Sequence, residues 1–195
     1  MPLSVTMANS NAPFLANKFL RAVYFGITGE VKQGLCSGQL DLTEKIHGKS
    51  LLRIAGEKGH REITMLLVEH GMDANESGGR RKHSLLHHAA LTYNFGFASV
   101  LLNKQAIPSP RSSNNSTPLH IAARTGQEYL ARKLIEFEAE IDAQDTLGRT
   151  PLHLAFAKGH AQLARKMIDA NANIQIEDKH GVTPSRVAEM MDIVI

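Results

Sequence analysis

One alanine position recurs along the chain at a nearly constant interval. Its copies are separated by 33, 34, 33, 33 and 33 residues, and they are Ala22, Ala55, Ala89, Ala122, Ala155 and Ala188. A fixed interval of this length is the signature of a repeat protein, in which each unit packs only on its neighbours. The periodicity therefore predicts a stack of similar units instead of a layered globular domain.

The residues around each alanine carry the signals of a short helix. In the clearest copy Thr150 precedes Pro151, and Gly159 follows the alanine by four residues. Threonine can cap a helix, proline suits the first helical position, and glycine can adopt the left-handed conformation that ends a helix. A second apolar-periodic segment follows, and then a polar turn such as residues 145–148. The pattern predicts two short antiparallel helices and a hairpin in each unit.

The same segment also carries a shared motif. Thr117-Pro118-Leu119-His120-Ile121-Ala122 recurs at residues 150–155, and three weaker copies lie elsewhere in the chain. This motif at this interval resembles the ankyrin-repeat family. The resemblance implies an all-α repeat solenoid of paired antiparallel helices joined by β-hairpin fingers. It also implies that His120 and His153 form hydrogen bonds within and between repeats.

The repeats account for nearly the whole chain. We expect a flexible N-terminal tail at residues 1–13 and an ankyrin-repeat domain of about six repeats at residues 14–195. The first repeat is a divergent cap and the last a truncated one, with boundaries at 14–44, 45–78, 79–111, 112–144, 145–177 and 178–195. Because no room is left for a catalytic domain, and no phosphate-binding loop, nucleophile elbow or zinc-protease motif occurs, we expect that the protein is not an enzyme.

Composition narrows the setting in which the protein works. The formal net charge of +3 is too small to indicate nucleic-acid binding by itself. The single cysteine, Cys36, cannot form an internal disulfide and is expected to be a small packing residue on a second helix. No apolar stretch is long enough to span a membrane. We expect an intracellular protein, cytoplasmic or nuclear and monomeric when free, or a secreted bacterial effector in a host cytosol.

Ten histidines raise the question of a metal site. The most ligand-like group is His83, His87 and His88, because a four-residue spacing can place His83 and His87 on one helical face. No cysteine or carboxylate completes the coordination shell beside them. We therefore expect no metal, no cofactor and no small-molecule substrate.

Departures from the repeat pattern mark candidate contact regions. The finger at residues 76–83 has one extra residue and ends in four basic or histidine side chains, whereas the finger at 107–116 is rich in Pro, Ser and Asn. Tyr93 replaces the glycine that ends the first helix, so Asn94 or a shifted turn is expected to supply the left-handed residue. Tyr93 and Phe95 fit either packing between helices or an aromatic contact patch. Residues 190–195 end the chain apolar.

Basic residues occupy equivalent positions in several repeats. Stacked repeats align such positions in rows, which predicts a basic stripe interrupted by Glu57. The candidate partner-binding residues are Lys49, Lys58, Arg80, Arg81, His83, Tyr93, Phe95, Arg124, Arg149 and Lys158.

These features favour a non-enzymatic protein–protein interaction module. Such an adaptor, scaffold or inhibitor would hold a partner with an acidic segment along its concave face and finger tips. One alternative is a binder of nucleic acid or an anionic surface through the basic finger, Arg80–His83, although nucleic acid is the less favoured partner. Another is a regulatory subunit of a separate enzyme.

Overall fold

The computed structural model describes residues 17–193 of the 195-residue chain. They divide into two compact units, one ending at Met72 and the other beginning at Asp73. The predicted tail at 1–13 and the last two residues of the apolar C-terminus lie outside the described residues.

The first unit contains two helix pairs and one hairpin. Helices α2 and α3 form one pair and α4 and α5 the other, with α2 against α4 and α3 against α5. The hairpin β1–β2 pairs Lys45 with Ser50 and Ile46 with Lys49. The elements are α2 (Lys18–Phe25), α3 (Thr28–Cys36), β1 (Lys45–Ile46), β2 (Lys49–Ser50), α4 (Leu51–Lys58) and α5 (Arg61–Glu69).

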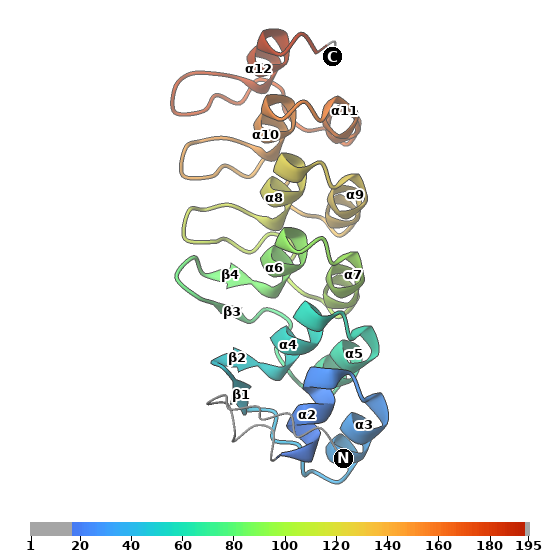
Figure 1. Ribbon diagram of the computed structural model, residues 1–195. Coiled ribbons are helices and arrows are strands. Elements are labelled where there is room, and N and C mark those ends of the chain that lie inside the picture. Colours follow the sequence, from blue (N-terminus) through green and yellow to red (C-terminus); the bar gives the residue numbers. More distant parts are fainter. Residues whose placement is uncertain (1–16, 194–195) are drawn as a thin grey trace, which may run out of the picture. The chain divides into compact units, whose positions relative to one another are not determined.

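The second unit repeats the same arrangement (Figure 1). Its first helices stack in one row, its second helices stack in another, and the fingers extend from the first row on the side away from the second helices. The first helices are α6 (Leu85–Leu91), α8 (Pro118–Thr125), α10 (Pro151–Ala157) and α12 (Pro184–Met190). The second helices are α7 (Phe95–Asn103), α9 (Glu128–Glu136) and α11 (Ala161–Asp169).

The fingers differ from the predicted hairpins. Within residues 17–193, strand pairing is present only in β1–β2 and in the finger of β3 (Ser77–Gly78) and β4 (His83–Ser84). In two later fingers an aspartate organises a turn instead. Asp145 accepts hydrogen bonds from the backbone N–H groups of Leu147 and Arg149, and Asp178 forms an equivalent turn. The turn is fixed by a side chain, so a strand ladder is not required.

The motif histidines fix the start of each first helix. The Thr117 hydroxyl caps α8, and Nδ1 of His120 accepts the Thr117 backbone N–H at 3.1 Å. Because Nδ1 faces a donor, the proton lies on Nε2, which donates to the Arg149 carbonyl at 3.0 Å. His120 thus closes its own helix start and binds the following repeat.

Two further histidines make the same connection. Nε2 of His153 lies 2.9 Å from the Val182 carbonyl, and Nε2 of His87 lies 2.8 Å from that of Ser116. The role predicted for His120 and His153 is therefore confirmed, and His87 shares it although it was grouped with candidate metal ligands. Over the described part of the chain, no cluster of three or more His, Cys, Asp or Glu residues could hold a metal ion.

The recurrent alanines occupy the tightest positions in the first helices. All six are at most 1% exposed. Only a small side chain lets neighbouring first helices approach this closely. The alanine therefore recurs at a fixed interval because each first helix needs a small residue where it packs on its neighbours.

The ends of the first helices show why Tyr93 stands out. Gly126 ends α8 with φ = 70°, and a Cβ atom there would lie 2.7 Å from the His160 ring, so both conformation and space require glycine. At the same point after α6, Tyr93 itself adopts φ = 55°. The prediction that Asn94 or a shifted turn would supply this conformation was wrong, since the Asn94 side chain instead caps α7.

The remaining comparisons with the sequence concern Cys36 and the apolar C-terminal end. Cys36 is exposed at the end of α3, so its predicted packing role was wrong. At the C-terminal end, Met190 is 71% exposed and Met191 46%, and neither folds back onto the repeats. No helix between residues 17 and 193 is long and apolar enough to cross a membrane.

Candidate functional site

Successive fingers of the second unit are joined to one another by backbone hydrogen bonds. The Ser113 N–H donates to the Arg81 carbonyl at 2.9 Å, and the Thr146 N–H donates to the Asn114 carbonyl at 3.0 Å. A third bond runs from Lys179 to Leu147. These bonds fix the distance between the finger tips, and hence the spacing of side chains along that edge.

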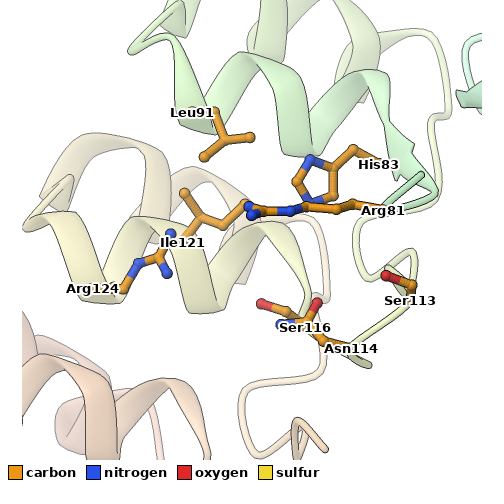
Figure 2. Close-up of a pocket in the computed structure, with 8 residues that line it drawn as sticks. All are labelled: Arg81, His83, Leu91, Ser113, Asn114, Ser116, Ile121 and Arg124. Carbon is orange, nitrogen blue, oxygen red and sulfur yellow. The ribbon is translucent and has the colours of Figure 1, made fainter. Parts of the chain in front are cut away.

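A cavity of about 340 Å³ opens between two of these fingers and the first helices behind them (Figure 2). It is open to solvent and lies wholly within the second unit. Its lining comes from two fingers and from helices α6 and α8, and comprises Arg81, His83, Leu91, Ser113, Asn114, Ser116, Ile121 and Arg124. Three of the predicted partner-binding residues are therefore brought together here: Arg81, His83 and Arg124.

The two arginines point into the same space. Arg81 extends from its finger toward α8 so that its guanidinium lies beside Ile121, and the Arg124 guanidinium turns toward it (Figure 2). Both residues are exposed. No acidic side chain of the described chain pairs with either guanidinium, and neither donates a hydrogen bond there. Two positive charges held close together without a counter-charge favour the binding of an anion.

His83 forms one side of the cavity. Its ring stacks on His87 at 5.2 Å between centroids, with only 7° between the ring planes. His87 is held in turn by Ser84 and Ser116. The stack fixes the orientation of His83.

The first unit has a cavity at the same repeat position, with a different charge pattern. It lies between Tyr24, Ile54, Glu57 and Lys49, among others. Each of these stands 67 residues before its counterpart in the second unit, and Glu57 occupies the position of Arg124. The Lys49 ammonium pairs with Glu57 at 2.6 Å. Glu57 thus neutralises one of the two lysines that line this cavity, Lys49 and Lys58, whereas the lining of the second unit's cavity contains no carboxylate.

Arg149 is engaged within its own finger. Its guanidinium binds the Asp145 carboxylate through Nε at 3.1 Å and Nη2 at 2.7 Å. Burial alone would raise the pKa of the Asp145 carboxyl, but hydrogen bonds from the Arg149 side chain and backbone and from the Leu147 N–H outweigh burial and lower that pKa. The Arg149 charge is thereby largely offset, and its main visible role is to stabilise the turn.

The other basic candidates do not line this cavity. In the first unit, Lys58 sits over the Tyr24 ring at 4.3 Å. In the second unit, Lys158 is exposed at the end of α10, and Arg80 is exposed beside Arg81 without lining the cavity. The structure therefore brings Arg81, His83 and Arg124 together in one lining, which does not include the other predicted basic residues.

The aromatic candidates lie at the turn between first and second helices. Tyr93 is 55% exposed. Phe95 contacts Tyr129 edge to face at 5.7 Å, and the Arg132 guanidinium lies 5.5 Å from the Tyr129 ring. Phe95 is thus used in packing between neighbouring repeats, while Tyr93 presents its ring to solvent.

A second cavity, of about 360 Å³, lies on the second helices α9 and α11. Its lining includes Ile135, Leu163 and Met167. Charged residues at its rim pair with each other, as Lys166 does with Glu128 and Arg132 with Glu136. This surface combines an apolar floor with two ion pairs at its rim. It is the main rival, as a contact surface, to the cavity lined by Arg81 and Arg124, which we call the arginine cavity.

Sequence reasoning found Arg81, His83 and Arg124 but missed the uncharged residues that line the same cavity. Leu91 and Arg124 each follow a recurrent alanine by two positions, while Ile121 precedes one directly. In the first helices these positions face the neighbouring finger. The sequence analysis compared only the basic residues at equivalent positions of the repeats. An alignment of all residues across the repeats would have placed the serines and Leu91 beside the two arginines.

Comparison with known proteins tests the predicted fold and family. A family model of ankyrin repeats matches residues 86–178 in three copies. The match confirms the predicted family for residues 86–178, and the structure confirms the all-α repeat solenoid, although the match covers three copies where about six were predicted. A search of curated proteins found no match.

Proposed function

Because residues 86–178 belong to the ankyrin-repeat family, we propose that this chain is an adaptor, scaffold or inhibitor that binds a partner protein through the arginine cavity of its second unit. Ankyrin repeats are in general protein-interaction modules and not catalysts. We propose that this chain also has no activity of its own. The bound segment of the partner is acidic.

The convergence of Arg81 and Arg124 carries this proposal. Two other arginines of the unit are paired, Arg149 with Asp145 and Arg111 with Glu140. The guanidinium groups of Arg81 and Arg124 have no acidic partner within residues 17–193 and lie beside an open cavity, so both can donate charge-assisted hydrogen bonds to a bound protein. Complementary charge of this kind raises the association rate and fixes the orientation of the partner.

Nucleic acid suits this surface less well. Proteins that bind single strands combine a basic groove with aromatic rings on which bases stack. The only aromatic ring lining the cavity, that of His83, is already stacked on His87. A regulatory subunit of an enzyme would be one form of the proposed interaction, with the enzyme as partner.

Reversing the charge of the cavity is expected to abolish most partner binding. After the partner is identified by affinity purification and mass spectrometry, its Kd is measured at physiological salt for wild type and for Arg81→Glu/Arg124→Glu. We expect the double variant to bind at least about tenfold more weakly, because both charges act at one place. Helical circular dichroism should not change, since both side chains are exposed.

A matched control carries the same charge change outside the cavity. Lys82→Glu/Lys179→Glu alters two exposed finger lysines of the same unit that do not line the cavity. This variant should bind nearly as wild type does. If both double variants bind the partner equally weakly, the loss of affinity comes from overall charge, and the proposed site is rejected.

A further inference from the structure

We propose that the arginine cavity binds a phosphate monoester carried by a side chain of the partner. This inference rests on the proposed function, since it names the chemical group that the cavity recognises. It concerns the pocket lined by Arg81, Arg124 and the neighbouring finger residues.

The number of charges favours a dianion. Arg81 and Arg124 direct two positive charges at one space, with no carboxylate of the described residues beside them (Figure 2). A carboxylate brings one negative charge and leaves one guanidinium uncompensated, whereas a phosphate monoester carries nearly two near neutral pH. Its three terminal oxygens also suit two guanidinium forks approaching from different elements.

The finger opposite Arg81 supplies neutral donors. Ser113 and Ser116 line the cavity with hydroxyl groups, and Asn114 lies between them. The Asn114 Oδ1 lies 2.7 Å from the Ser112 hydroxyl oxygen, and the Asn114 amide NH2 is a further donor group of this finger. Hydroxyl and amide donors complete the coordination of phosphate oxygens that the arginines leave open.

The shape of the cavity suits a side chain on a protein segment. Leu91, 39% exposed, and Ile121 form an apolar wall that can cover the aliphatic part of a phosphorylated residue. The volume of about 340 Å³ is large enough for a single side chain of this size. Within the lining, bases of a nucleic acid would have no aromatic ring on which to stack except that of His83, which already stacks on His87.

The equivalent cavity of the first unit provides a natural contrast. There Glu57 replaces Arg124 and Lys49 replaces Ser116, and these two side chains bind each other. A carboxylate at the place of the second guanidinium repels phosphate. Phosphate should therefore bind in the second unit and leave the first unit unaffected.

NMR of the full chain can test this without the partner. Inorganic phosphate, O-phosphoserine, acetate and glutamate are titrated separately at constant ionic strength, while the Arg side-chain Nε–Hε and the Ser113 and Asn114 backbone signals are followed. We expect saturable shifts with both phosphates and at least about tenfold weaker binding of both carboxylates. Arg81→Gln and Arg124→Gln should each weaken phosphate binding, while Lys82→Gln should leave it unchanged.

The outcomes separate this inference from the proposed function. Equal binding of acetate and inorganic phosphate, or phosphate binding that persists in Arg81→Gln/Arg124→Gln, would overturn it. Tighter, Arg81-dependent binding of an oligothymidylate than of O-phosphoserine would also overturn it, in favour of nucleic acid. If charge reversal abolishes partner binding while phosphatase treatment of the partner has no effect, the proposed function stands and the phosphate inference fails.

Discussion

Ala122→Asp is expected to lower the free energy of unfolding by roughly 3–5 kcal/mol, because it buries an unpaired carboxylate. Ala122 is fully buried in α8, which packs against both α6 and α10. Stability in a repeat array is shared between neighbours, so the lesion should affect the whole second unit. The measurement is a thermal or urea melt followed by circular dichroism.

A matched substitution isolates burial as the cause. Ala157→Asp makes the same change at an exposed position near the end of α10. Its cost should stay below about 1 kcal/mol, mostly from an acidic group near a helix C-terminus. If the unfolding midpoint of Ala122→Asp is as high as that of Ala157→Asp, the repeats do not pack around the recurrent alanines as described.

Acid is expected to destabilise the second unit well above the pH at which carboxylates protonate. Burial lowers the pKa of His87 and of His120 to about 4, from an ordinary value of 6.5. Between these values the unfolded chain binds protons that the folded chain does not, so the free energy of unfolding falls as pH falls from 6.5 toward 4. Each histidine contributes a slope approaching 1.4 kcal/mol per pH unit, an order-of-magnitude figure.

The structural reason lies in the connection between repeats. Nδ1 of each histidine accepts a backbone N–H, and protonation at Nδ1 removes that acceptor. Below about pH 4 the contribution of these two groups levels off, and loss of the Asp145 carboxylate then follows at lower pH because its pKa is lowered.

Urea melts at pH 7, 6, 5 and 4.5 measure this dependence. The variant His87→Asn/His120→Asn keeps an acceptor oxygen near the position of Nδ1 but cannot titrate, so its stability should be lower at pH 7 and nearly independent of pH down to 4.5. His180→Asn, at an exposed finger position, should retain the wild-type slope. A double variant that keeps the full slope would show that other groups cause it.

The backbone plan of the protein could be predicted from sequence because it rests on local chemistry. The interval between alanines, the caps such as Thr117 and the glycine after α8 each act within a few residues of themselves. The histidine bridges were predictable too, because the motif places His120 at the third helical position, where it reaches its own cap and the next repeat.

The charges of the surface could not be predicted in the same way. Whether a basic residue is available depends on acids that the fold brings close, such as Glu57 beside Lys49 and Asp145 beside Arg149. Asp145 lies four residues before Arg149 and would have been a usable signal. The conformation of Tyr93 depends on a turn that glycine normally makes, and no local rule indicates that tyrosine will adopt it.

Hydrogen–deuterium exchange of the complex tests the location of partner binding most directly. The partner should slow exchange at the finger amides of residues 79–83 and 111–116, which flank Arg81 and the serines of the cavity, and at the end of α8 near Arg124. Protection confined to α9 and α11, around Ile135 and Met167, with the finger amides unchanged, would contradict the account and assign binding to the apolar surface of the second helices.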